Sequence, residues 1–226
     1  MLQIYIMWGG GANSRFANWV DYDNDGDLDL YVSNSHFENN LYENRINENN
    51  TFLEISYYYA LNDSGRSGAS NWFDYDNDGD LDLFLANLID PNFPHLYPGS
   101  KLYRNEINIT GQFVDITNAI GIFDTTSSRS CTVGDYDNDG DLDLYLGCYG
   151  RGLKNKLFRN DVNISGLFTE FGAIANVADT MNALGTLSGD YDNDGDLDLY
   201  VMNLSDDPCR MYKNNTNSSS FLKFVY

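Results

Sequence analysis

One decapeptide, DYDNDGDLDL, occurs four times without a single change, beginning at Asp21, Asp74, Asp135 and Asp190. Each copy holds five aspartates within nine residues. Carboxylates this close repel one another strongly unless a cation neutralises them. The copies begin 53, 61 and 55 residues apart, so the chain consists of repeated units of similar length. Any fold for this chain must therefore present the same acidic loop four times.

Two further signatures follow each acidic loop in the same order. The first reads NLYEN, KLYRN, KLFRN and RMYKN in the four units, and the second reads TFLEIS, QFVDIT, LFTEFG and SFLKFV. A stretch such as SNWFD precedes the loop, and an apolar stretch such as LDLYVSN follows it. Alternating or continuous apolar residues between Gly, Asn, Asp and Ser are typical of short strands joined by turns. Each unit is therefore predicted to contain four strands.

This organisation predicts an all-β fold, a propeller-like array of four-stranded antiparallel blades. A solenoid of sheets is the less favoured alternative. We expect one repeat domain over residues 1–226. The blades are expected at about residues 12–60, 65–121, 127–175 and 182–226. Residues 1–8 read as the last strand of a preceding or closing blade, and this surplus strand favours a stretch of a larger propeller over a compact ring of four.

The order of the strands also predicts two different faces. In an antiparallel meander the acidic loops between first and second strands share one face, and the loops between second and third strands share the opposite face. The latter loops vary in length, and variable loops on a rigid scaffold are the usual place for binding. Ligand contacts are therefore expected near residues 36–40, 88–100 and 149–155.

The acidic loop has the composition of a hard-cation site. Aspartate stands at positions 1, 3, 5, 7 and 9, and the glycine at position 6 permits a sharp turn. Oxygen ligands alone favour calcium, and the loop contains no His or Cys for zinc or copper. We expect side-chain ligation by positions 1, 3, 5 and 9, with position 7 adding its backbone carbonyl while its side chain points to solvent.

About one Ca²⁺ is expected in each repeat, four in total. The candidate metal residues are Asp21, Asp23, Asp25, Asp27 and Asp29 in the first loop, Asp74, Asp76, Asp78, Asp80 and Asp82 in the second, Asp135, Asp137, Asp139, Asp141 and Asp143 in the third, and Asp190, Asp192, Asp194, Asp196 and Asp198 in the fourth. The alternative is an acidic, solvated turn that holds no metal.

An EF-hand shares the beginning of this motif but not its end. It requires a bidentate Glu at position 12 and a helix on each side of the loop. Position 12 is Val32, Leu85, Leu146 and Val201 in the four copies, and the flanking residues read as strands. The sequence therefore excludes an EF-hand.

These features resemble the FG-GAP and VCBS-type calcium-binding repeats, which are related to the blades of integrin α-chain propellers. The resemblance covers essentially the whole chain and rests on the four acidic loops, the preceding GASNWFDYD stretch and the trailing LYRN and FVDIT signatures. It implies a β-propeller with calcium in the first hairpin of each blade. It also implies that ligands are engaged on the face opposite the calcium loops.

The net charge of −21 is concentrated in the loops. They hold 20 of the 34 acidic residues, and the remaining 14 face 13 lysines and arginines, so the rest of the chain is almost neutral. No basic patch is evident for phosphates, so nucleic acid is not an expected partner. No apolar run approaches the ~18 residues that a membrane-spanning helix requires.

Two kinds of covalent modification are predicted, each with an alternative. Cys131 and Cys148 flank the third loop, so they are candidates for a disulfide across a hairpin, although buried free thiols are equally compatible with the sequence. Glycosylation sequons stand before the last strand of the units, where hairpin tips are exposed. Asn and Ser are also simply good turn residues. The candidate glycosylation sites are Asn49, Asn108, Asn163 and Asn217.

The sequence favours binding over catalysis. Its two histidines, His36 and His95, are part of no recognisable catalytic arrangement, so we expect that the protein is not an enzyme. We expect an extracellular or cell-surface module for adhesion, stabilised by calcium, that binds a protein or glycan ligand. The alternatives are a self-associating structural subunit of a glycosylated filament, or a non-catalytic or partial segment of a polysaccharide-acting enzyme.

Overall fold

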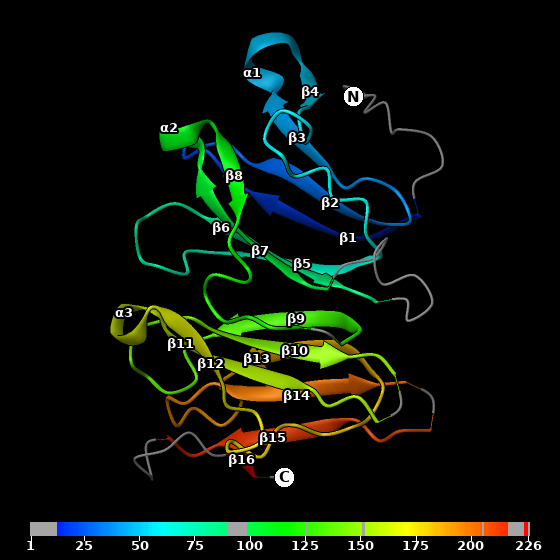
Figure 1. The fold of residues 1–226 in the computed structure, drawn as a ribbon, viewed down its shortest axis with the longest axis vertical. Coiled ribbons are helices and arrows are strands. Elements are labelled where there is room, and N and C mark those ends of the chain that lie inside the picture. The colour runs from blue at the N-terminus through cyan, green and yellow to red at the C-terminus, as the bar shows by residue number, and fades with distance from the viewer. Residues whose placement is uncertain are drawn as a thin grey trace.

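Four antiparallel sheets follow one another in the computed structural model, in the order of the sequence (Figure 1). The structure describes residues 13–89, 99–124, 126–150, 152–204, 206–216 and 224–225. The prediction of an all-β fold built from four-stranded antiparallel units is confirmed. Residues 1–8, predicted to form a further strand, lie outside the described residues.

Each sheet is a meander in which neighbouring strands are also consecutive in the chain. The first sheet contains β1 (Asn13–Val20), β2 (Asp29–Ser35), β3 (Asn40–Arg45) and β4 (Thr51–Glu54). The second contains β5 (Ser67–Phe73), β6 (Asp82–Asn87), β7 (Lys101–Glu106) and β8 (Gln112–Asp115). The third contains β9 (Ser128–Gly134), β10 (Asp143–Cys148), β11 (Lys156–Asp161) and β12 (Leu167–Glu170). The fourth contains β13 (Ala183–Gly189), β14 (Asp198–Asn203), β15 (Arg210–Asn214) and β16 (Phe224–Val225).

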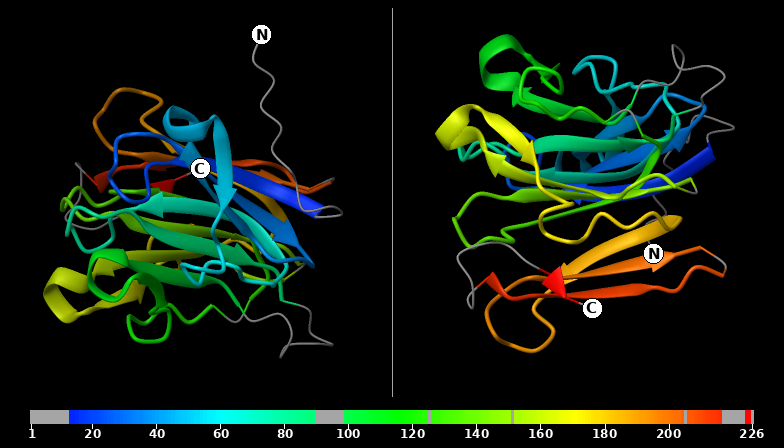
Figure 2. Two further views of the ribbon diagram at one scale, coloured as in Figure 1. Left: turned by 90° about the horizontal axis from the view of Figure 1, so that it is seen from above. Right: turned by 60° about the horizontal axis from the view of Figure 1, so that its bottom comes forward.

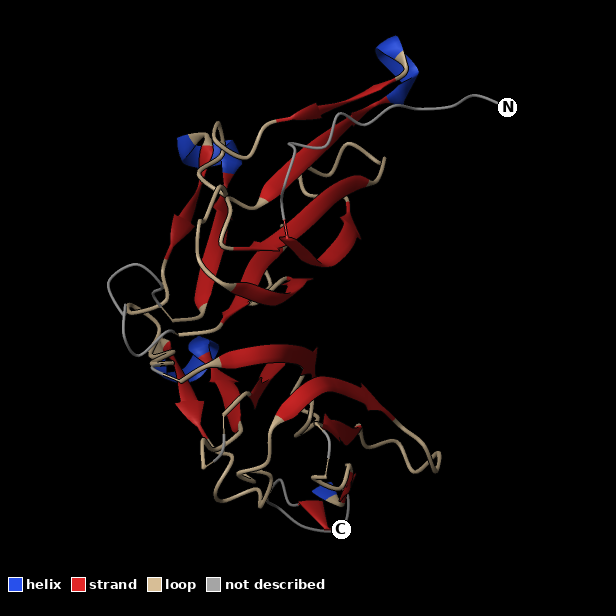
Figure 3. Cartoon of the chain, turned by 90° about the vertical axis from the view of Figure 1, so that its right-hand side faces the viewer, coloured by secondary structure: helices blue, strands red, loops and turns tan. Residues whose placement is uncertain are grey.

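A single helical turn joins the third and fourth strands of the first three sheets (Figure 3). These turns are α1 (Ile46–Asn49), α2 (Ile107–Thr110) and α3 (Val162–Ser165). Each ends in a residue with left-handed backbone conformation, which closes the turn and allows the chain to reverse. The predicted glycosylation sites Asn49, Asn108 and Asn163 lie in these turns and are exposed, whereas Asn217 lies outside the described residues.

The second strand of a sheet packs through both of its faces. In β6, Leu83 and Leu85 belong to the core shared with the first sheet. Phe84 and Ala86, on the opposite face, belong to the core shared with the third sheet. All four side chains are buried, because successive residues of a strand point to opposite sides. The continuous apolar runs after the acidic loops therefore reflect strands that lie between two neighbouring sheets.

The first strands of the sheets lie side by side, with β1 beside β5, β5 beside β9, and β9 beside β13. A close approach of the backbones requires small residues at this contact. A Cβ atom at Gly68 of β5 would lie only 2.5 Å from the carbonyl oxygen of Arg129 in β9. Any side chain at Gly68 would therefore force these two strands apart.

An asparagine at the end of the third strand holds the second, third and fourth sheets each to the sheet before it. In β11, the Asn160 side-chain amide donates hydrogen bonds to the carbonyl of Leu142 in its own acidic loop (3.2 Å) and to that of Tyr75 in the preceding loop (2.8 Å). Its side-chain oxygen accepts a hydrogen bond from the Val162 N–H at 3.1 Å. Asn105 and Asn214 make the same bond to the preceding loop. Asn160 is fully buried, so no water can replace these bonds.

The two buried cysteines do not form the predicted disulfide. In the pairing of β9 with β10, Cys131 lies opposite Leu146, whereas Cys148 lies opposite Ser128. The two thiols are free and have different neighbours: the Asn71 amide lies 2.9 Å from the Cys131 sulfur, and the Thr126 hydroxyl lies 3.3 Å from the Cys148 sulfur. The position of the two cysteines on either side of the third loop therefore does not make them partners, because strand register decides which residues face each other.

We predict that Asn160→Ala lowers the free energy of unfolding by roughly 2–4 kcal/mol, because it leaves one buried carbonyl, one partly buried carbonyl and one partly buried N–H without partners. Denaturant unfolding measures this change. Asn108→Ala, at an exposed position of α2, is the matched control and should change the free energy by less than about 0.5 kcal/mol. Equal stability of the two variants would contradict the assigned role of Asn160.

Candidate metal centres

The local backbone of each acidic loop follows directly from its sequence. In the third loop, Asn138 and Gly140 adopt positive φ angles of 60° and 95°, the region that Asn tolerates and Gly prefers. The two carboxylate oxygens of Asp135 accept the N–H groups of Asp139 (3.1 Å) and Gly140 (3.0 Å). The other three loops repeat these bonds and angles. Position 1 therefore closes each loop around its own carboxylate.

In every loop, the turn gathers three carboxylates into one cluster. One oxygen from each member lies within 4.8 Å of the others. The clusters are Asp21, Asp23 and Asp29; Asp74, Asp76 and Asp78; Asp135, Asp137 and Asp143; and Asp190, Asp192 and Asp194. Positions 1 and 3 belong to all four clusters, and position 5 or 9 completes each. Position 7 belongs to none of them.

The aspartate at position 9 is buried and fixes the loop to its sheet. The oxygens of Asp143 accept the N–H groups of Asn160 (2.8 Å) and Tyr136 (3.0 Å). Burial raises the pKa of Asp143 to about 8 and that of its counterpart Asp82 also to about 8, despite these hydrogen bonds. Near neutral pH a cation beside such a carboxyl must therefore displace a proton to bind.

The aspartate at position 3 supplies the clearest sign of a metal. One side-chain oxygen of Asp76 and one of Asp137 are buried and accept no hydrogen bond from the described residues. Burial and the nearby charge of Asp139 raise the pKa of Asp137 to about 6. A buried carboxylate oxygen without a donor, inside a cluster of carboxylates, is the arrangement that a calcium ion would satisfy. The residues present therefore fit Ca²⁺.

The aspartate at position 7 has a role that differs from the prediction. Its side chain was expected to point to solvent, but in three loops it accepts a hydrogen bond from the position-4 asparagine of the preceding loop. These bonds are Asn24 to Asp80 (2.8 Å), Asn77 to Asp141 (2.7 Å) and Asn138 to Asp196 (2.7 Å). The prediction was wrong because it considered each loop alone, whereas neighbouring loops lie within bonding distance of one another. We call this series of bonds the loop ladder.

The four centres also differ in charge because of the residue that precedes the asparagine of the third strand. In the fourth loop, Lys213 forms ion pairs with Asp192 and with Asp194, the latter at 3.0 Å. In the third loop, Arg159 lies 4.0 Å from Asp137. In the first loop the corresponding residue is Glu43. Burial and the neighbouring aspartates raise the pKa of Asp23, and the charge of Glu43 adds to this effect. The first centre is therefore the most negative, and in the fourth a single lysine charge already pairs with two of the candidate ligands.

Sequence reasoning overlooked the two sets of asparagines that connect the loops. The signal was present, because every copy of the decapeptide has Asn at position 4 and every LYxN-type signature ends in Asn. Identical residues explain a shared local turn equally well, so the repeat pattern alone cannot reveal that they bond to the neighbouring unit.

Comparison with known proteins identifies part of this arrangement. Residues 21–85, which extend from the first acidic loop into β6, match the family model of the FG-GAP-like repeat. No curated protein sequence matches the chain. Within the described ranges, no helix has both the length and the apolar character needed to cross a membrane.

We predict that Lys213→Gln increases the calcium affinity of the fourth loop roughly 10-fold, since the substitution removes a positive charge that competes for Asp192 and Asp194. Isothermal titration calorimetry of the chelated protein with calcium measures the affinity. Lys154→Gln removes the same charge at an exposed position away from the acidic loops and serves as the control. Identical isotherms for the two variants would show that Lys213 does not compete with calcium.

Proposed function

Because the chain carries an FG-GAP-like repeat, we propose that it is an extracellular, calcium-stabilised module of the β-propeller type that binds a protein or glycan ligand without catalysing a reaction. The observation that supports this most strongly is the recurrence of one carboxylate cluster in all four loops. The family match covers the first and second loops, and the hydrogen-bond pattern extends the same construction to the third and fourth.

Calcium would act in this protein as a structural ion. Asp76, Asp137 and their equivalents would supply ligand oxygens, and the bound charge would relieve the repulsion among the carboxylates. The same loops carry the Asn24, Asn77 and Asn138 amides of the loop ladder. Fixing one loop therefore also fixes the donor that its neighbour needs, so that the ion would stabilise the contact between sheets as well as the turn.

Two features of the fold support a propeller-type arrangement. The first strands of the four sheets lie side by side, as expected of the innermost strands of propeller blades. The second strands are buried between consecutive sheets, as in stacked blades. The acidic loops and the loops between second and third strands lie at opposite ends of these strands, which leaves the latter face for a ligand.

The carboxylates favour a structural role over an acid–base role. Asp82 and Asp143 have raised pKa values, as catalytic acids often do, but both are buried and bonded to backbone N–H groups. A substrate cannot reach a carboxyl in this setting. We therefore propose that the raised values reflect a calcium centre, and that the protein is not an enzyme.

An extracellular location agrees with the kind of site proposed. Calcium sites of extracellular modules commonly bind with dissociation constants of about 10⁻⁴–10⁻³ M, which suits the calcium concentration outside cells. The exposed sequon residues Asn49, Asn108 and Asn163 are placed where a glycan could be attached.

Removal of calcium should lower the melting temperature by roughly 10–20 °C, the effect of four sites that each contribute about 1–1.5 kcal/mol in millimolar calcium. Differential scanning calorimetry in calcium and in EDTA measures the difference. Asp137→Asn should reduce the calcium-dependent part by about a quarter, whereas Asp206→Asn, exposed and outside the loops, should not. A melting temperature that is the same in EDTA and in calcium would refute the proposal.

Self-association into a filament is a second candidate function, and the loop ladder favours it. One oxygen of Asp27 in the first sheet is buried and has no hydrogen-bond partner among the described residues. Asn193, at the other end of the ladder, occupies the donor position but makes no ladder bond to a described residue. Asn193 of one copy could therefore donate to Asp27 of a second copy and continue the series.

The fourth sheet lies at one end of the series of sheets (Figure 2, right), and its outer face carries exposed apolar side chains. Leu187 and Tyr191 are more than half exposed, and Met202 and Met211 are also exposed. Tyr22, Tyr75 and Tyr136, which stand at the position of Tyr191 in the other loops, are buried against the following sheet. A head-to-tail contact between the fourth sheet of one copy and the first sheet of another would bury Tyr191 in the same way.

We predict that the protein self-associates at micromolar concentrations in calcium and that Tyr191→Glu weakens this association at least about 10-fold, because it places a charge in an apolar contact. Sedimentation velocity over a concentration series measures the assembly. Phe123→Glu is the matched control, since Phe123 is 64 % exposed in the segment between β8 and β9, which belongs to neither the first nor the fourth sheet. A wild-type protein that stays monomeric throughout the series would rule out the filament.

A further inference from the structure

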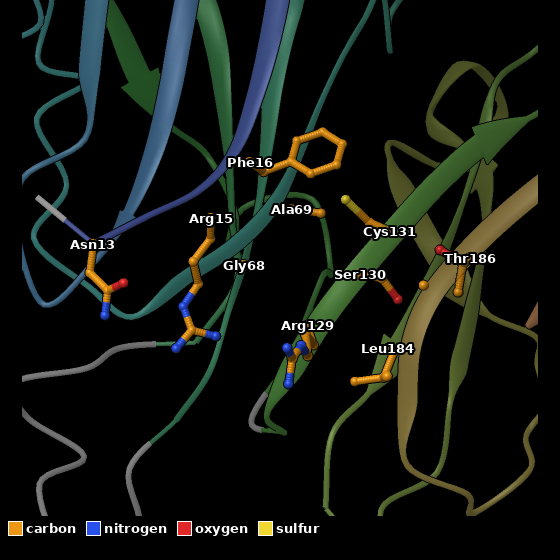
Figure 4. Close-up of a pocket in the computed structure, with 11 residues that line it drawn as sticks. Asn13, Arg15, Phe16, Gly68, Ala69, Arg129, Ser130, Cys131, Leu184 and Thr186 are labelled. Carbon is orange, nitrogen blue, oxygen red and sulfur yellow. The ribbon is translucent and has the colours of Figure 1, made fainter. Parts of the chain in front are cut away.

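A cavity of about 450 Å³ lies where the first strands of all four sheets come together (Figure 4). It is lined by residues near the beginnings of β1, β5, β9 and β13. The acidic loops follow the opposite ends of these strands, as the position of Arg15 near the start of β1 and of Asp21 just after its end illustrates. The cavity is therefore remote from the metal centres, and its volume is in the range of small-ligand sites.

Two arginines give this cavity a positive charge in a strongly acidic chain. The guanidinium groups of Arg15 and Arg129 lie on the same side of the cavity, as Figure 4 shows. Neither arginine forms an ion pair with a described residue. The pKa of Arg15 is lowered by burial and by the positive charges of Arg129 and Arg66. Arg129 lies over the Tyr149 ring, 5.1 Å from its centroid, but no carboxylate separates the two arginines. An anionic ligand would remove the repulsion between them.

The cavity also contains hydroxyl groups without partners. The side-chain oxygens of Ser130 and Thr186 are buried and make no hydrogen bond to the described residues. A buried hydroxyl without a partner is costly, because it has lost its hydrogen bonds to water. Both residues line the cavity, so rotation of either side chain about χ1 would present its hydroxyl to a molecule inside it. They suit a ligand that itself carries several hydroxyls.

One aromatic ring, that of Phe16, also lines the cavity. Phe16 of β1 lines the cavity and is 44 % exposed, although the chain has abundant buried positions for aromatic residues. The side-chain amide of Asn13 adds a further donor and acceptor. An exposed aromatic face beside amide and hydroxyl groups offers a surface on which a sugar ring can pack while its hydroxyls are bonded.

We propose that this cavity binds an acidic sugar residue of a glycan, with Arg15 and Arg129 on its carboxylate and Ser130 and Thr186 on its hydroxyls. The inference rests on the proposed binding function and names the class of ligand. A carboxylate matches the planar, forked donors of arginine. The hydroxyls and the aromatic ring favour a sugar over an acidic peptide. A nucleic acid is disfavoured because the net charge of −21 repels a polyanion at longer range.

The test is isothermal titration calorimetry of the calcium-loaded chain with trigalacturonic acid and with sialyllactose. Neutral maltotriose and lactose are the sugar controls, and tetraglutamate is the peptide control. We expect saturable binding of at least one acidic saccharide, little binding of the controls, and weaker binding at higher salt. Arg15→Gln and Arg129→Gln should each weaken binding at least about 10-fold, as expected for the loss of a charged hydrogen bond. Arg45→Gln, which removes the same charge at the end of β3, on the side of the acidic loops, should leave binding unchanged.

Three outcomes would overturn the proposal: no binding of either acidic saccharide at millimolar concentration, binding that both arginine substitutions leave unchanged, or preferential binding of tetraglutamate. The calcium-dependent melting temperature, measured on the same samples, separates this proposal from the proposed function. If calcium stabilises the chain but no acidic sugar binds, only the assignment of this cavity fails. If calcium does not stabilise the chain, the proposed calcium-stabilised function fails, whether or not an acidic sugar binds.

Discussion

Crowding of carboxylates is the constraint on which the structure depends. The decapeptide places five like charges on a turn that also buries one of them, at position 9, against the backbone of its own sheet. Two sets of hydrogen-bond donors offset part of this repulsion. Backbone N–H groups bond to positions 1, 5 and 9, and asparagine amides from the preceding loop bond to position 7. In the second and third loops these donors leave one oxygen of position 3 unsatisfied. The remaining charge is the part that a metal ion would have to balance.

The same crowding explains how local and long-range structure are connected. A turn that needs donors from outside itself cannot be stable in isolation, so each loop depends on the third strand of its own sheet and on the loop before it. Asn105, Asn160 and Asn214 lie on these third strands, and each bonds to its own acidic loop and to the preceding one. The hydrophobic cores between sheets and the polar contacts between loops therefore specify the same arrangement. Agreement between separate kinds of interaction is what allows a repeated sequence to select one packing.

Sequence reasoning could predict most of the fold because the same pattern of strands and turns recurs four times. Strand number, order and the acidic turn follow from periodicity and turn residues, which act over a few positions. What could not be predicted depends on neighbours that are remote in sequence. The partner of Asp141 is Asn77, 64 residues away, and strand register separates Cys131 from Cys148. Arg15 and Arg129 come together only because their strands are aligned, and no local motif surrounds either residue.

The two-sided packing of the second strands has a consequence for how the molecule comes apart. When one sheet opens, it exposes apolar surface on both of its neighbours, so that an interior sheet can open only at the cost of two interfaces. The fourth sheet shares one hydrophobic core, with the third, and its outer residues are already in water. Among the described sheets, the first likewise shares a core with one neighbour only, so we expect opening to start at the first or the fourth sheet and to advance inwards, as it does in linear repeat proteins whose stability is a sum over neighbours. The chain behaves as a short one-dimensional lattice, in which amide hydrogens of the inner sheets exchange last.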